Sequence, residues 1–299
     1  MNTRKRQKWA YLFIFPFFAS FLTFSIYPIF YSLYISFHSY DPLTLRLSPV
    51  GWDNYIRLFQ SDYFWSSVLN TIEIWLISII PQLTIALILS LILNERWVKG
   101  KNALRSVYYF PNLITPITIG MLFTLLFGYP GGAINNLFTS IGLFSQAIDF
   151  KETPILAKIV GGLAICWQNF GYNIIFITAG LHSISTDVYE AAEVDGANAW
   201  HRTTKITLPL LRPIMLYIMI TSVIGGLQIF DIPKMLFGGG TDTYATRTMV
   251  LYMYESAFEN WQFGYGAAAA YTIALIIGAF SLLSILFNAF QGRNKKEVA

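Results

Sequence analysis

Six long apolar runs, separated by polar and aromatic segments, make up most of the chain. They cover approximately residues 10–37, 66–93, 103–127, 155–179, 214–237 and 263–290. A membrane-spanning helix needs about 20 consecutive apolar residues, whereas a strand of a membrane barrel shows about ten residues of alternating polarity. The pattern therefore predicts six membrane-spanning helices.

Composition agrees with an all-α, polytopic membrane protein. Of the 299 residues, 55% are hydrophobic and 12% are charged, which is about half the charged fraction of a soluble domain. The first run is longer than the core of a signal peptide and has no small-residue cleavage site, so we expect an uncleaved span. No internal repeat is visible, and we expect one membrane domain over residues 10–291, between a basic head (1–9) and a basic tail (292–299).

The distribution of positive charge predicts the orientation. With six spans, both termini lie on the same side of the membrane. The segments on that side hold 14 of the 20 lysine and arginine residues, and the segments on the other side hold six. Because cytoplasmic loops carry the excess of lysine and arginine, we expect both termini in the cytoplasm. The net charge of +4 then reflects topology, and we expect no nucleic-acid partner.

The chain lacks the sequence patterns of common enzymes. There is no phosphate-binding G-x-x-x-x-G-K-[ST] loop, no H-E-x-x-H, no C-x-x-C and no G-x-S-x-G. His38, His182 and His201 are scattered near the ends of the runs, and the single cysteine lies within an apolar run. We therefore expect no catalytic residue, no metal site and no cofactor in this chain, and any ATP and magnesium would be bound by partner subunits.

The longest polar insert on the predicted cytoplasmic side covers residues 183–213, between the fourth and fifth runs. The residues Asp187 and Glu190 match a capping box and predict a short helix from Val188 that ends near Gly196. The insert carries an ordered pattern of small, acidic and turn-forming residues: Glu190, Ala191, Ala192, Gly196, Ile206, Leu208 and Pro209. Taken singly, these residues are also explained by helix capping and turns. As an ordered set, they favour a mechanical coupler tied to two spans.

This spacing resembles the E-A-A-x3-G-x9-I-x-L-P loop of permease subunits in ATP-binding-cassette importers. The D-G-A that follows E-A-A resembles the sugar-importer branch, and the resemblance covers nearly the whole chain. It implies that the insert is a cytoplasmic coupling helix between helices four and five. Glu190, Ala191, Ala192 and Gly196 would dock on an ATPase subunit, and the Ile206, Leu208 and Pro209 segment would shape the return to the membrane.

The resemblance also implies partners and a location. It predicts a second homologous permease subunit, two cytoplasmic ATP-binding subunits and an extracellular solute-binding protein. The protein would be a multi-pass component of the bacterial cytoplasmic membrane, surrounded by lipid. Closure of the ATPase pair would drive rigid-body alternating access.

Polar side chains at membrane depth mark a possible solute path. They are Gln168, Asn169 and Asn173 in the fourth run, Gln228 and Asp231 in the fifth, and Tyr271 in the sixth. Amides and a carboxylate, interleaved with aromatic residues such as Trp167, Tyr172 and Phe230, suit a sugar ring. The alternative is that these groups pack helices together through interhelical hydrogen bonds. The resemblance leaves open whether this chain or its permease partner holds the solute.

Another class of protein remains as an alternative. A secondary, ion-coupled transporter would need buried acidic residues and a repeated pair of broken helices. The chain offers Asp231 and no visible repeat. A channel or a passive scaffold would have no need of the long insert at 183–213.

Overall fold

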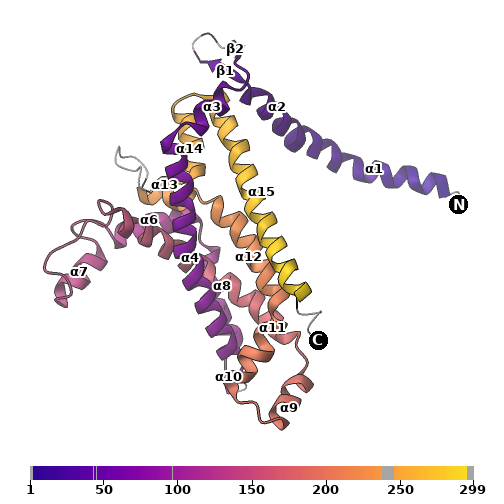
Figure 1. Cartoon of the computed structure of the whole chain (residues 1–299), viewed down its shortest axis with the longest axis vertical. Coiled ribbons are helices and arrows are strands. Elements are labelled where there is room, and N and C mark those ends of the chain that lie inside the picture. Colours follow the sequence, from indigo (N-terminus) through magenta and orange to yellow (C-terminus); the bar gives the residue numbers. More distant parts are fainter. Residues whose placement is uncertain (1–2, 43, 45, 96, 238–245, 295–299) are drawn as a thin grey trace. The chain divides into compact units, whose positions relative to one another are not determined.

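The computed structural model describes residues 3–42, 44, 46–95, 97–237 and 246–294. The ends of the predicted head and tail, at 1–2 and 295–299, lie outside the described residues. The chain divides into two compact units, one of residues 1–64 and 252–275 and one of residues 65–251 and 276–299 (Figure 1). The single membrane domain over 10–291 stays a prediction.

The first unit begins with the first apolar run, which is helical as predicted. Helix α1 (Thr3–Phe21) continues through a π-helical turn, η1 (Leu22–Ile26), into α2 (Tyr27–Ser36). The wider turn lies just before Pro28, whose ring prevents a regular hydrogen bond to the carbonyl four residues earlier. The local change that proline predicts is therefore a π-helical turn within a continuous helix.

The rest of the first unit contains the only sheet among the described residues. Strands β1 (His38–Asp41) and β2 (Arg46–Pro49) pair antiparallel, with His38 opposite Pro49, so the prediction of an all-α chain is correct except for this hairpin. Helix α3 (Asp53–Phe59) follows, and the buried Asn54 amide donates hydrogen bonds to the carbonyls of Ser36 (2.8 Å) and His38 (3.0 Å). The end of α14 (Met249–Tyr254), the turn η4 (Glu255–Glu259) and the start of α15 (Phe263–Asn294) complete the unit.

The second unit is built around α8 (Pro154–His182), the fourth apolar run. It also contains most of α4 (Asp62–Asn94), with α5 (Lys101–Leu113), α6 (Pro116–Leu126), α7 (Ala133–Ser140), α12 (Arg212–Leu227) and α13 (Asp231–Phe237). Two hydrophobic clusters lie along α8, one that includes Phe123 and Ala164 and one that includes Ile177 and Ile218. An ion pair between Lys158 Nζ and Glu73 Oε2 (2.5 Å) joins α8 to α4.

The predicted third span, 103–127, is sharply bent. It consists of α5 and α6, which meet at an angle of 91°. Pro116 is the first residue of α6, and a proline forces the residue before it out of the helical conformation. Thr115 is accordingly extended (ψ 142°), and its side chain caps α6 by accepting a hydrogen bond from the Thr118 amide.

The predicted fifth span, 214–237, is also two helices. Helix α12 ends at Leu227, residues 228–230 are not helical, and α13 begins at Asp231. Pro233 has no N–H to donate to the Ile229 carbonyl, which is therefore left free at the break. The Thr248 hydroxyl donates to that carbonyl instead (2.9 Å).

Four helices in the described part of the chain are long and apolar enough to cross a membrane. They are Tyr11–Ser36, Asp62–Asn94, Pro154–His182 and Phe263–Leu286. Two bent pairs, Lys101–Leu113 with Pro116–Leu126 and Ala199–Leu210 with Arg212–Leu227, raise the number to six if each pair is one span. The fold is thus that of a helical membrane protein with broken helices.

Candidate functional site

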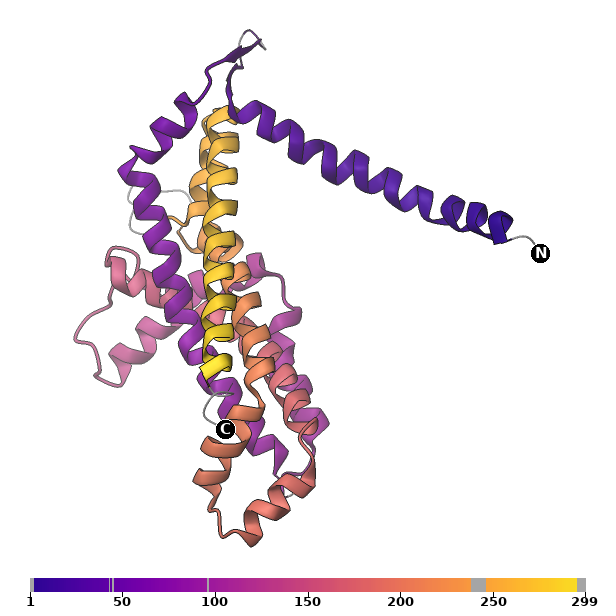
Figure 2. The same cartoon turned by 45° about the vertical axis from the view of Figure 1, so that its right-hand side comes forward.

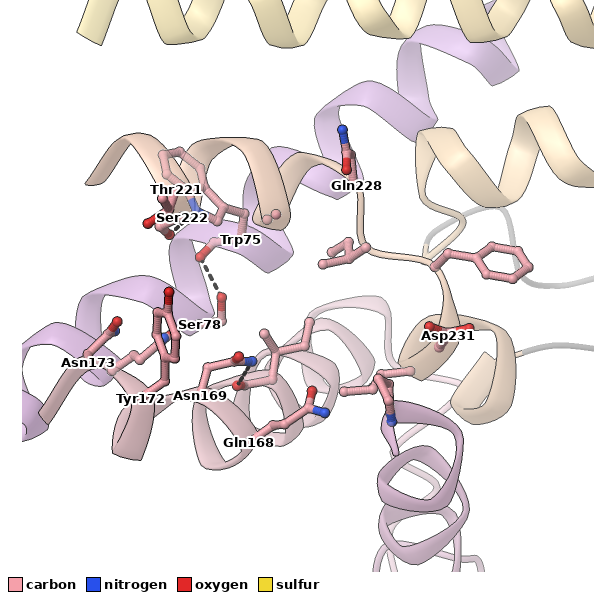
Figure 3. Close-up of a pocket in the computed structure, with 18 of the residues that line it drawn as sticks. Trp75, Ser78, Gln168, Asn169, Tyr172, Asn173, Thr221, Ser222, Gln228 and Asp231 are labelled. Atoms are coloured by element: carbon pink, nitrogen blue, oxygen red, sulfur yellow. Dashed lines mark hydrogen bonds between the residues drawn. The ribbon is translucent and has the colours of Figure 1, made fainter. Parts of the chain in front are cut away.

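A cavity of about 360 Å³ lies within the second unit, where α12 gives way to α13 (Figure 3). Five of the six predicted solute-path residues line it: Gln168, Asn169, Asn173, Gln228 and Asp231. Helices α4, α8 and α12 supply the walls, and the non-helical residues 228–230 cross one side. The break in the fifth apolar run therefore brings Gln228 and Asp231 to the face of α8 that carries the amides.

Tyr271 is not among the residues that line this cavity. It belongs to the first unit, where its hydroxyl donates a hydrogen bond to the Ile29 carbonyl and lies 3.4 Å from Ser32 Oγ. Trp167 likewise packs in a hydrophobic cluster, 6.1 Å from the Phe123 ring between centroids. The grouping of these two side chains with the polar cluster is therefore not seen in the structure.

Sequence reasoning missed several polar lining residues. They are Trp75, Ser78 and Gln82 on α4, and Thr221 and Ser222 on α12. The spacing of Trp75, Ser78 and Gln82 places them on one face of a helix, and this stripe within an apolar run was the signal that could have found them. The Trp75 indole N–H donates to Ser222 Oγ (2.9 Å), so α4 and α12 are hydrogen-bonded at the cavity wall.

The amides on α8 differ in how they are paired. Gln168 Nε2 donates to the Ile114 carbonyl (3.3 Å), at the break between α5 and α6, and Asn169 Nδ2 donates to the Ile165 carbonyl (3.0 Å). Asn173 is only 2% exposed, yet its Nδ2 has no hydrogen-bond partner among the described residues. An unpaired buried amide costs free energy, so Asn173 is the member of this set best suited to meet a polar ligand.

The cavity is lined by both polar and apolar groups and is almost uncharged. Asp231 is the single charged residue among the described residues that line it, and the other polar groups are amides and hydroxyls. No group of three or more histidine, cysteine, aspartate or glutamate residues in the described part of the chain is placed to hold a metal ion. The arrangement can donate and accept many neutral hydrogen bonds around the Trp75 and Tyr172 rings.

The insert at 183–213 forms α9 (Thr186–Val194), α10 (Ala199–His201), the π-helical turn η2 (Arg202–Thr207) and α11 (Leu208–Leu210). It lies beyond the ends of α8 and α12 in both views (Figures 1 and 2). The predicted capping box is wrong, because the cap is Ser185, whose Oγ accepts from the Asp187 amide (3.3 Å). Asp187 instead lies in the first turn, where a negative side chain favours the helix N-terminus.

The end of α9 near Gly196 is as predicted. Gly196 is left-handed (φ 76°), its N–H bonds the Glu193 carbonyl (3.0 Å), and the Ala197 N–H bonds the Ala192 carbonyl (2.9 Å). These two bonds form a Schellman motif, in which glycine is favoured because it has no Cβ to strain a positive φ. Gly196 therefore fixes the direction in which the chain leaves α9.

Side-chain contacts hold α9 against the segment that follows it, η2 and α11. Buried Thr207 donates to the Arg202 carbonyl (3.2 Å) and lies 3.1 Å from Tyr189 Oη. Arg202 Nη1 is 2.7 Å from Glu193 Oε1, an ion pair on the surface whose contribution to stability is small. These contacts join α9 to the segment that leads into α12.

The predicted docking residues lie in different environments. Glu190 lines an open groove of about 980 Å³ together with Trp97, His182, Glu193 and Arg202. Ala191, Gly196 and Pro209 are exposed and Ile206 and Leu208 are half-buried, whereas Ala192 is only 7% exposed. The side chain of Ala192 therefore packs inside the insert.

Replacing Gly196 with alanine is expected to loosen the end of α9 without a steric clash. No atom lies within 4 Å of a Cβ at this position, so the cost is the left-handed backbone alone, about 1–2 kcal/mol. Hydrogen exchange of the Ala197 amide should speed up by about tenfold, since about 1.4 kcal/mol is a factor of ten. Gly196→Asn, which tolerates positive φ better, should show a smaller increase. Equal protection in Gly196→Ala and the parent protein would contradict this account.

Polar groups gathered around a broken helix inside a helical membrane protein define a class, the membrane transport proteins. Within that class, the chain belongs to the family described as "binding-protein-dependent transport system inner membrane component", whose model matches residues 82–296. The family identified from the E-A-A spacing is confirmed, and so is the multi-pass membrane location. The chain is a permease component of an importer of this type.

Relatives of known role span nearly the full chain. The lactose transport system permease protein LacF of Rhizobium radiobacter is 33% identical over 92% of both chains. The arabinooligosaccharides transport system permease protein AraP of Bacillus subtilis is 32% identical, covering 94% of this chain and 89% of AraP. These relatives are transport permeases, in agreement with the expected lack of an enzyme activity.

A solved structure shares the fold. It is a chain in the crystal structure of a bacterial alginate ABC transporter in complex with an alginate pentasaccharide-bound periplasmic protein. The TM-score is 0.81 at 25% identity, over 97% of this chain and 96% of that chain. Nothing in these comparisons favours the alternative of a secondary transporter.

Proposed function

We propose that this chain forms, with a second homologous permease subunit, the translocation path for a sugar or oligosaccharide. An extracellular solute-binding protein delivers the solute, and two cytoplasmic ATPase subunits, which bind ATP and magnesium, supply the energy. Family membership supports the general role. The observation that carries the sugar assignment is the 360 Å³ cavity of neutral hydrogen-bonding groups and aromatic rings.

The chemistry of the cavity suits a polyhydroxylated ring. Amides and hydroxyls both donate and accept hydrogen bonds, as sugar hydroxyls do. Trp75 and Tyr172 provide aromatic faces against which the apolar side of a ring can pack. The volume lies within the range of about 300–1,000 Å³ that is usual for small-molecule pockets. The names of LacF and AraP, which refer to lactose and arabinooligosaccharides, support the same class of solute.

The coupling role of the insert is part of the proposal. We assign Glu190, Ala191 and Gly196 to contact with an ATPase subunit, and Ala192 to the internal packing that holds α9 in shape. Six spans, at the six apolar runs of the sequence, and cytoplasmic termini complete the proposed topology. The contacts of Tyr189 with Thr207 and of Glu193 with Arg202 support the coupling role, because they link α9 to the segment that leads into α12.

Leucine at cavity positions is expected to lower uptake without impairing assembly. Asn173→Leu and Gln228→Leu each keep a similar side-chain size but remove the hydrogen-bonding amide. Because a site built for polar contacts rejects unmatched groups strongly, uptake should fall at least about tenfold. The measurement is solute uptake in proteoliposomes with all subunits and ATP, beside co-purification of the partners.

The matched control is Leu125→Ile, an exposed position on α6 that does not line the cavity. Unchanged uptake in both leucine variants would contradict the proposed path. Uptake by this chain alone, driven by an ion gradient with no ATPase present, would instead favour the secondary transporter.

A further inference from the structure

The charges around the cavity are one-sided. Its polar lining consists of neutral amides, hydroxyls and an indole N–H, with one carboxylate, Asp231. No lysine, arginine or histidine is among the described residues that line it. A solute in the cavity therefore meets one negative group and no positive group.

Asp231 is placed to act on a solute. It is the first residue of α13, directly after the non-helical residues 228–230, and it is half-buried. Among the described residues its carboxylate has no ion-pair partner within 4.0 Å. Lys234 lies one turn further along α13 and is not part of the cavity lining. No cation of the described part of the chain therefore forms an ion pair with Asp231.

The charge lies at one end of the cavity. Figure 3 shows Asp231 on the opposite side of the labelled residues from Asn173, with Gln168 and Asn169 between them. A sugar chain in the cavity would place one end beside the carboxylate and its other hydroxyls beside neutral groups. Asp231 would therefore interact with the charge of the solute at one end of the cavity.

We infer that this cavity selects neutral glycans and excludes glycans that carry a carboxylate, and that Asp231 determines this specificity. The inference rests on the proposed function of the cavity. A neutral sugar can donate two hydroxyl hydrogens to the carboxylate, and hydrogen bonds to a charged acceptor are stronger than neutral ones. A uronate would bring a second negative charge close to that carboxylate, and like charges at short distance repel. Rejection of an unwanted partner by like charge is a common source of specificity.

The shared fold does not determine whether the cavity accepts neutral or acidic glycans. The similar chain of known structure belongs to a transporter of alginate, whose crystal structure contains an alginate pentasaccharide-bound periplasmic protein. Fold and solute charge are separate properties, because specificity depends on the side chains of the site. The inference therefore distinguishes two chains that superimpose over nearly their full length.

The test is a competition for binding in the purified permease–ATPase complex, without the solute-binding protein. Saturation-transfer NMR would be recorded on an equimolar mixture of neutral gluco-, galacto-, manno- and arabino-trisaccharides and the tri-uronates of glucuronic, galacturonic and mannuronic acid. We expect the ratio of neutral-sugar binding to uronate binding to be at least ten. In Asp231→Asn the ratio should fall toward one through a gain of uronate binding, and Asp231→Glu should keep the original ratio.

Two outcomes would overturn the inference. One is equal binding of uronates and neutral sugars by the parent complex, and the other is an unchanged ratio in Asp231→Asn. Asn173→Leu separates this failure from failure of the proposed function, because it should weaken binding of every sugar without changing the ratio. If no sugar in the mixture depends on Asn173, the cavity is not the solute site, and the proposed function of the cavity fails with the inference. Co-purification of the ATPase confirms that each variant is assembled.

Discussion

Glu190→Lys is expected to abolish association with the ATPase subunits while the protein still inserts in the membrane. Glu190 lies on α9, lines the open groove and makes no hydrogen bond or ion pair with the described residues that would be lost from the fold itself. Reversal of its charge should therefore act on the partner, since like charges across an interface cost several kcal/mol. The measurement is the yield of ATPase subunits that co-purify with the tagged permease, which should fall at least about tenfold.

The matched control is Glu152→Lys, the same charge reversal at an exposed residue before α8, on the predicted outer side. It should leave the yield unchanged. Glu190→Gln, which removes the charge but keeps the shape, should have an intermediate effect. Wild-type recovery of the ATPase with Glu190→Lys would show that this glutamate is not part of the docking surface.

Gly171→Ala is expected to destabilise the second unit strongly. A Cβ at this position would lie 1.9 Å from the carbonyl oxygen of Tyr108 and 2.6 Å from its carbonyl carbon, so α5 would have to move away from α8. Backbone cannot shift as a flexible side chain can, and overpacking of this kind costs about 1–3 kcal/mol and occasionally more. The measurement is the midpoint of thermal unfolding of the purified protein, which should decrease, together with the folded yield.

The same substitution at Gly278, in the middle of α15, provides the comparison. No atom lies within 4 Å of a Cβ there, so Gly278→Ala should be neutral or slightly stabilising, because alanine is the better helix former. A similar loss of stability in both variants would mean that the effect arises from changing a helical glycine and not from the approach of α5.

The sequence predicted the apolar helices better than their interruptions. Runs such as 66–93 and 155–179 became the long helices α4 and α8, because a continuous apolar stretch in lipid can satisfy its backbone only as a helix. The break at 228–230 depends on how the carbonyl freed by Pro233 is satisfied. Its partner, Thr248, is 19 residues away from Ile229, and a local pattern does not reveal it.

The sequence likewise predicted part of the candidate site, namely the polar residues that share a face of one helix. The amides at 168, 169 and 173 share a helix face by spacing alone, so their grouping followed from periodicity. Trp75 and Ser222 were missed because their hydrogen bond joins α4 to α12, which periodicity within one run does not show. Tyr271, chosen for its place in the sixth run, belongs to the other unit, and its part in the solute path stays a prediction.

The hydrogen bond from Thr248 to the Ile229 carbonyl bears on how this protein could change during evolution. The donor is the residue just before α14, so the irregular backbone at 228–230 is stabilised by a side chain that does not line the cavity. Neighbouring side chains such as Gln228 can therefore be replaced without loss of that support. A framework of this kind lets natural variation retune the recognised solute through a few exchanges, while the surrounding helices keep their arrangement.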